Sequence, residues 1–190
     1  ERWGYDPNGA KKALNNYPRI TQFLINGLKA AGDTLRLKRI AYANGGENGN
    51  APGTSVQKEV VANYSGTPFG VSSGYLPANT VSLGPSLLVK GEFNRPYILM
   101  TASEIQFLLA EAKQRYSDVT LPGTAKAYFE EGIKQSFRVL GANVAGAETF
   151  KGSKIVNYDW DASTDKLAAI ATQKWIALNN FSGLEAWAEY

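Results

Sequence analysis

The clearest pattern in the chain is the helical spacing of apolar residues from position 101 onward. The apolar positions recur every three or four residues, at Ile105, Leu108, Leu109 and Ala112. This spacing predicts a helix over residues 101–116 that buries this face. Thr101 and Glu104 form a Thr-x-x-Glu capping box, in which the Thr hydroxyl accepts a hydrogen bond from the Glu backbone N–H. We therefore expect the helix to begin at Thr101.

Two further helices and the start of a fourth follow the same rule. The second helix ends at Leu140 before Gly141 and carries Phe129, Ile133, Phe137 and Leu140 on one face. The third begins near Ser163 or Thr164 and carries Leu167, Ile170, Trp175 and Leu178. A fourth helix starts after Gly183. The sequence thus predicts a mainly α fold of TPR-like antiparallel helix pairs, with the aromatic residues of the helices in its core.

The first 96 residues have a different pattern, because 13 of the 19 glycines and 7 of the 8 prolines fall there. Glycine and proline interrupt helices and strands, so this composition favours long irregular loops. A helix from Pro18 to Gly32 is predicted, with an extended conformation of residues 19–25 as the alternative. Alternating residues predict two short strands, over 34–42 and 56–64. We expect one domain, with residues 1–96 a loop-rich segment packed on the helical region 97–190.

Composition excludes much of ordinary enzyme chemistry, because the chain has no His and no Cys. Imidazole bases, cysteine nucleophiles and zinc sites built on these residues are absent. Carboxylates are the remaining acid–base candidates. Glu130 and Glu131 are adjacent on a helix and point about 100° apart, and Glu185 and Glu189 are typical of a solvated helix surface. We therefore expect no catalytic site and no cofactor.

The segment Asp159–Asp165 places side-chain oxygens at alternate positions, as the start of a calcium loop does. It lacks the Gly and the Glu that an EF-hand needs at its sixth and twelfth positions, which here are Thr164 and Ile170. Capping of the following helix is the favoured interpretation and calcium binding the alternative. We predict no metal site.

Charge and hydropathy give no sign of a nucleic-acid partner or a membrane span. The net charge is +3, with 11 basic against 6 acidic residues before position 97 and 9 against 11 after it. The basic residues are scattered, and no apolar run approaches the roughly 20 residues of a spanning helix. The chain starts without Met and stops within a helical pattern, so we expect a piece of a longer chain.

The aromatic residues of the first half offer a different chemistry. They stand among Gly, Asn and Ser, where a ring can present an apolar face to the C–H side of a sugar. The stacking candidates are Trp3, Tyr42, Tyr64 and Tyr75. The alternative is that these rings fold inward and hold the loops.

Three stretches in the second half resemble motifs of the SusD/RagB-like family. Residues 97–112, with Met100-Thr101 and Phe107-Leu-Leu-Ala-Glu-Ala112, are similar to its "M-T-x-A-E-x-x-F-L-x-A-E-A" helix. Residues 128–133 are similar to its "Y-Y-x-x-G-I" helix. Residues 173–178 and 183–190 are similar to its C-terminal signature. Before position 97 the resemblance is limited to residues 17–20.

The resemblance implies a TPR-like, all-α outer-membrane lipoprotein on the cell surface. Such proteins bind glycans without catalysing a reaction and pass oligosaccharide to a TonB-dependent transporter for nutrient uptake. The lipid anchor would lie outside residues 1–190. The family's sugar contacts come from variable loops, so the resemblance transfers no contact residue to this chain. A helical protein-interaction scaffold without a sugar site of its own is the alternative function.

Overall fold

The computed structural model describes residues 6–10, 12, 18–44, 60–71, 73, 76–86, 98–179, 181–183 and 186. The chain divides into two compact units, Glu1–Pro96 and Tyr97–Tyr190, and the division falls where the Gly- and Pro-rich composition ends. Within the described residues the fold is mainly helical with one two-stranded antiparallel sheet. None of the helices in these ranges is long and apolar enough to cross a membrane.

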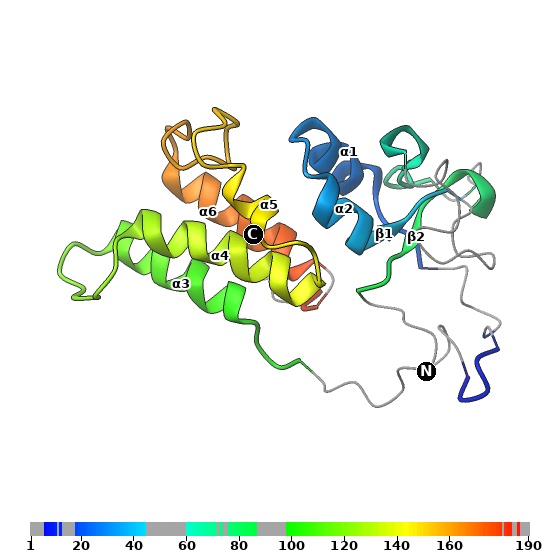
Figure 1. Cartoon of the computed structure of the whole chain (residues 1–190), viewed down its shortest axis with the longest axis horizontal. Coiled ribbons are helices and arrows are strands. Elements are labelled where there is room, and N and C mark those ends of the chain that lie inside the picture. The colour runs from blue at the N-terminus through cyan, green and yellow to red at the C-terminus, as the bar shows by residue number, and fades with distance from the viewer. Residues whose placement is uncertain are drawn as a thin grey trace. The chain divides into compact units, whose positions relative to one another are not determined.

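The second unit is built from an antiparallel helix pair and a third long helix (Figure 1). α3 (Ala102–Arg115) and α4 (Ala125–Leu140) form the pair, and α6 (Lys166–Leu178) packs against both. α5 (Ala145–Glu148) is a single turn between α4 and α6. The predicted TPR-like pairing is confirmed.

The ends of these helices lie where their capping residues stand. Thr101, Thr124 and Asp165 each accept a hydrogen bond from the backbone N–H three residues on, at 3.1, 3.1 and 2.9 Å. Gly141 ends α4 in the left-handed conformation at φ 68°. The predicted capping interactions at Thr101 and at the start of α6 are therefore confirmed.

Aromatic rings fill the core between the helices. Phe107 of α3 and Phe129 of α4 have centroids 6.1 Å apart, and Phe129 contacts Trp160 at 5.3 Å. Phe137 contacts Phe150, whose ring lies 4.8 Å from that of Tyr158. The core prediction holds for Phe107, Phe129 and Phe137, which are buried, whereas Trp175 is half-buried.

The predicted buried face of α3 is wrong. Ile105 and Leu108 are exposed, and the buried residues are Ser103, Glu104, Phe107 and Ala110 on the other side of the helix. Polar residues are buried there because they have partners: the Ser103 hydroxyl donates to the Gly132 carbonyl at 2.7 Å. A hydrogen-bonded polar side chain can occupy a core position that apolar spacing alone would not assign.

The first unit has two short helices around a small hydrogen-bonded sheet. α1 is Gln22–Ala30 and α2 is Thr34–Ile40; β1 (Ala41–Tyr42) pairs antiparallel with β2 (Ser82–Leu83). Two 3-10 turns, Val61–Asn63 and Pro77–Asn79, complete its described elements. The predicted helix from Pro18 begins four residues later, because residues 19–21 are extended and form isolated bridges to Ser82 and Thr67.

The strand predicted over residues 34–42 is wrong for most of its length. Asp33 caps α2 and also holds Arg36 in a buried ion pair at 2.6 Å, which fixes the helical i,i+3 spacing. Leu37 and Ile40 are buried while Leu35 is exposed, so the effective apolar period is three rather than two. The second predicted strand is also wrong in its described part, since residues 61–63 form a 3-10 turn.

Candidate functional site

The first unit positions Tyr42 at the end of its two-residue strand. α2 leads directly into β1, and Tyr42 pairs with Ser82 of β2. Gly84 makes this approach possible: a Cβ at Gly84 would lie 2.5 Å from the backbone nitrogen of Ala41. A side chain there would push the strands apart. The ring is half-buried, so part of its surface faces solvent.

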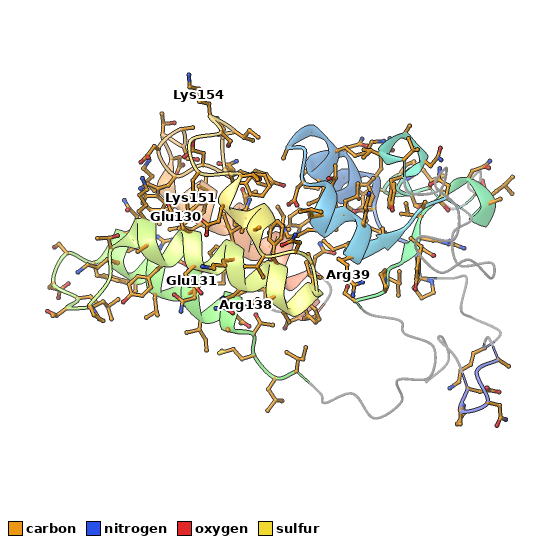
Figure 2. All side chains as sticks on the ribbon, in the orientation of Figure 1. Arg39, Glu130, Glu131, Arg138, Lys151 and Lys154 are labelled. Atoms are coloured by element: carbon orange, nitrogen blue, oxygen red, sulfur yellow. The ribbon has the colours of Figure 1, made fainter. Side chains whose placement is uncertain are left out.

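Tyr42 stays protonated at neutral pH. Burial raises the pKa of its phenol above the ordinary value of 10.0, and the Arg39 guanidinium offsets part of that rise. Arg39 comes from the last turn of α2 (Figure 2). A neutral phenol both donates and accepts hydrogen bonds, so the group suits hydroxyl-rich ligands as well as apolar ones.

A hydrogen-bonded amide, that of Asn44, stands two residues after Tyr42 in the chain. Asn44 accepts from the Ser65 backbone N–H at 2.8 Å through Oδ1 and donates to Ser65 Oγ at 3.1 Å through Nδ2. Its own backbone N–H donates to the Asn63 carbonyl at 2.8 Å. These bonds fix the loop after β1 against residues 63–65, so the amide of Asn44 is held in place two residues after Tyr42.

Of the four predicted stacking residues, the structure brings Tyr42 and Tyr64 into one region. Tyr64 follows Asn63 and its carbonyl accepts from Lys29 Nζ at 3.0 Å, but its side chain is buried, with 3% of the residue exposed. In this structure Tyr64 holds the loop from inside, as the alternative interpretation of the loop aromatics expected. Trp3 and Tyr75 lie outside the described residues.

One exposed ring stands on a loop without having been singled out as a stacking candidate. Phe69 is 72% exposed and follows Pro68, before Gly70 at φ 70°. Thr67, two residues before Phe69, is anchored to the start of α1. Its backbone N–H donates to the Ile20 carbonyl and its carbonyl accepts from the Gln22 N–H, both at 2.9 Å. The Pro-Phe-Gly turn was a usable signal, since Pro and Gly on either side of an aromatic residue favour a tight surface loop.

A shallow pocket of the second unit lies beside α4, with room for about one water molecule. It is lined by Glu130, Ile133, Ala147, Phe150, Lys151, Tyr158, Asp159 and Trp160. Lys166 Nζ lies 5.1 Å from the centroid of the Trp160 ring, and it donates to the carbonyls of Trp160 and Ser163. Because Phe129 and Lys166 both contact Trp160, this ring is committed to internal packing.

The carboxylates considered for acid–base chemistry are engaged in ion pairs on α4 (Figure 2). Glu130 Oε2 lies 3.2 Å from Lys151 Nζ, and Glu131 Oε1 lies 3.4 Å from Arg138 Nη1. The hydrogen bond to Glu148 raises the pKa of Lys151, and the same bond lowers that of Glu148. This is a structural network along a helix surface. Glu185 and Glu189 lie outside the described residues.

The segment Asp159–Asp165 organises a loop and caps a helix. Asp159 accepts from the backbone N–H groups of Lys154 at 3.0 Å and Asp161 at 3.1 Å. Asp161 binds Lys126 at 2.6 Å, which raises the pKa of Lys126. Among the described residues no group of three or more acidic side chains could hold a metal ion. The capping interpretation is confirmed at Asp165.

The sequence and fold of this chain are similar to those of known glycan-binding proteins. A family model described as SusD-like, starch-binding and associating with the outer membrane matches residues 6–190. A solved chitin-binding protein is 26% identical with a TM-score of 0.62; the match covers 88% of this chain and 36% of that one. No curated protein sequence matches the chain.

Two solved SusD homologues share the fold. The one from Bacteroides vulgatus ATCC 8482 has 24% identity and a TM-score of 0.65, and the match covers 88% of this chain and 36% of that one. The one from Bacteroides fragilis NCTC 9343 has 19% identity, a TM-score of 0.62 and coverage of 88% and 38%. The chain thus matches little more than a third of the length of these solved relatives. With the family model matching from residue 6 to the last residue, the chain belongs to the SusD-like family.

Proposed function

We propose that this protein is a non-catalytic glycan-binding component of an outer-membrane nutrient-uptake complex, which passes oligosaccharide to a TonB-dependent transporter. The observation that carries the proposal is the family match over residues 6–190, whose description names starch binding and association with the outer membrane. The similarity to a chitin-binding protein supports a glucose-based or related glycan as ligand.

The sugar surface that we propose lies in the first unit, at Tyr42. A half-buried ring gives a fixed apolar face, and the amide of Asn44 two residues on is held by Ser65. A sugar needs both features, because its C–H faces are apolar and its rim carries hydroxyl groups. Phe69 is a second stacking position on an anchored turn, and Trp3 and Tyr75 remain proposed contacts.

The ion pairs on α4 support a role in binding without catalysis. Glu130 and Glu131 are neutralised by Lys151 and Arg138 and come from one helix, whereas glycoside hydrolysis needs two carboxyl groups facing each other across the sugar. Attachment to the cell surface through a lipid anchor outside residues 1–190 completes the proposal. The partner in the membrane is the transporter.

Calorimetric titration of starch and chitin oligosaccharides into the intact protein tests the sugar surface. Removing a stacking ring costs on the order of 1–3 kcal/mol by analogy with base–aromatic stacking, or about ten- to a hundred-fold in affinity. We expect Tyr42→Ala and Phe69→Ala to lose affinity in this range and Tyr42→Phe to keep most of it.

Tyr116→Ala is the matched control, because Tyr116 is an exposed aromatic residue of the second unit. Unchanged affinity in both Tyr42→Ala and Phe69→Ala would contradict the proposed sugar surface, provided that circular dichroism shows each variant to be folded. If the intact protein bound no oligosaccharide at all but co-purified with an outer-membrane transporter, the interaction scaffold would be the better description.

A further inference from the structure

Three extended segments of the first unit place a row of polar and aromatic side chains beside one another. Ser82 of β2 pairs with Tyr42 of β1, and it also forms an isolated antiparallel bridge with Arg19. Residues directly opposite each other on neighbouring strands carry their side chains on the same face. Arg19, Ser82 and Tyr42 are therefore successive positions on one face, and we call them the Arg19–Ser82–Tyr42 row.

The opposite face of these segments belongs to the core. Ile20, Ala41 and Val81 each adjoin a member of the row in the chain, and successive residues of an extended segment point to opposite faces. All three are buried. The row therefore lies on the side that apolar packing does not use, and its two end members, Arg19 and Tyr42, are half-buried and reach solvent.

The middle of the row is a buried hydroxyl group. Ser82 is only 7% exposed, and its Oγ makes no hydrogen bond within the part of the chain that the structure describes. Buried hydroxyl groups of native proteins are nearly always hydrogen-bonded. The Ser82 hydroxyl is thus available to a partner that comes from outside the fold, between a cation on one side and an aromatic ring on the other.

Positive charge lies at both ends of the row. Arg19 Nη1 donates to the Val81 carbonyl at 3.3 Å, which holds the guanidinium beside β2. At the other end, the Arg39 guanidinium is close enough to Tyr42 to lower the pKa of its phenol, although burial raises that pKa overall. Residues 1–96 carry 11 basic against 6 acidic side chains. A surplus of positive charge favours anionic ligands.

The hydrogen-bonding chemistry of the row fits a carboxylate. A guanidinium only donates hydrogen bonds and an ionised carboxylate only accepts them, and such charge-assisted bonds are stronger than bonds between neutral groups. Neighbouring positions in a cross-strand row have Cβ atoms about 4.5–5.5 Å apart. One carboxylate can therefore accept from Arg19 and Ser82 together, while the sugar that carries it lies against the Tyr42 ring.

We propose that the Arg19–Ser82–Tyr42 row is a specificity site for a carboxylated sugar, which makes the ligand of this protein a glycan that contains uronic acids. Arg19 and Ser82 donate to the carboxylate, and Tyr42 contacts the C–H side of the ring. The inference rests on the proposed glycan-binding function and narrows its ligand. Starch and chitin, the glycans named for the family and for one solved relative, are neutral.

Calorimetric titration of the intact protein tests the preference. The probes are oligomers of galacturonic, glucuronic and mannuronic acid, the carboxyl-reduced counterpart of each, and starch and chitin oligosaccharides. We expect at least one acidic oligomer to bind ten-fold or more tightly than its carboxyl-reduced counterpart. Added salt should reduce this preference, because it screens the attraction between the guanidinium and the carboxylate.

Two substitutions assign the preference to the row. Arg19→Gln should bring the ratio of the acidic to the reduced affinity close to one, and Ser82→Ala should lower it about three-fold. Arg115→Gln is the matched control, because it removes the same charge from an exposed position of the second unit. Circular dichroism shows whether the variants are folded, and Ser82→Ala removes only a hydroxyl group should Arg19→Gln fail to fold.

The outcomes separate this inference from the proposed function. Binding of starch or chitin oligosaccharides with no preference for any carboxylate would overturn the specificity site and leave the proposed function standing. A preference for the acid that Ser82→Ala and a folded Arg19→Gln both retain would place the carboxylate elsewhere and overturn the assignment. A protein that bound none of these glycans would overturn both.

Discussion

Gly132 of α4 lies directly against the ring of Phe107 of α3. A Cβ at position 132 would stand 2.6 Å from Cε1 of Phe107, far inside van der Waals contact. The Gly132 carbonyl also accepts the hydrogen bond of the Ser103 hydroxyl. The two helices thus approach closely at one point, and the Gly of the "Y-Y-x-x-G-I" motif fits the Phe of the "F-L-x-A-E-A" motif.

We expect Gly132→Ala to lower the free energy of unfolding by about 1–3 kcal/mol, since the extra methyl group overpacks a closed core. Urea unfolding followed by circular dichroism measures the change. Phe107→Leu in the same background removes the clashing ring edge and is expected to recover part of the loss, which a merely local helix effect would not show.

Gly27→Ala is the matched control, because Gly27 is also within a helix and a Cβ there meets nothing within 4 Å. Without a clash, the substitution is expected to stabilise the first unit by about 0.5–1 kcal/mol. A destabilisation equal to that of Gly132→Ala would show that packing against Phe107 is not the cause.

The three long helices of the second unit could be predicted because each carries a boundary signal of its own. Thr101 and Gly141 report on local backbone hydrogen bonds, which depend on a few neighbouring residues. The buried side of α3 could not be predicted in this way. Ile105 and Phe107 are both apolar, and the absence of a side chain at Gly132 leaves the room in which the ring of Phe107 lies.

The candidate site was less predictable for the same reason. Tyr42 and Tyr64 both stand near Asn and Ser, yet one ring is half-exposed and the other is buried. The backbone at Tyr64 is also held by a contact that local composition does not reveal, the hydrogen bond from Lys29 to its carbonyl across 35 positions. Composition near a residue predicts a loop but does not determine which way its ring turns.

The buried pair of Asp33 and Arg36 gives a second prediction. Both side chains are fully buried, and Arg36 Nη2 lies 2.6 Å from Asp33 Oδ2. Arg36→Met leaves a buried carboxylate without this partner, and we expect a loss of about 3–5 kcal/mol in the free energy of unfolding. Adding Asp33→Asn, which keeps a cap for α2, should recover part of it. Equal stability of Arg36→Met and the parent would contradict the argument.

A pH dependence follows from Glu148 and Lys151. The hydrogen bond between them, 2.7 Å long, lowers the pKa of Glu148 below its ordinary 4.5. A lowered folded-state pKa adds stability above about pH 4.5 that is lost as the pH falls through the folded value. Both groups are about half-exposed, so Glu148→Gln should cost no more than about 1 kcal/mol at pH 7.

The cost of Glu148→Gln should shrink as the pH falls from 7 toward 2.5, because protonation of Glu148 in the folded state removes the ion pair. Paired urea titrations of parent and variant at the two pH values measure this. A cost that stayed constant with pH would assign the effect to lost packing instead of the ion pair.

Asp159 and Asp165 distinguish a hydrogen-bonded loop from a calcium site. The Asp159 carboxylate accepts from two backbone N–H groups and that of Asp165 from Ala168, so both already serve as acceptors inside the fold. We expect Asp165→Ala to cost about 1 kcal/mol as a lost cap and Asp165→Asn to cost much less. Calcium at millimolar concentration should leave the melting temperature unchanged in parent and variants alike. A bound ion would instead stabilise the parent by RT ln(1 + [L]/Kd), so a rise of several degrees that Asp159→Asn abolishes would establish the calcium site.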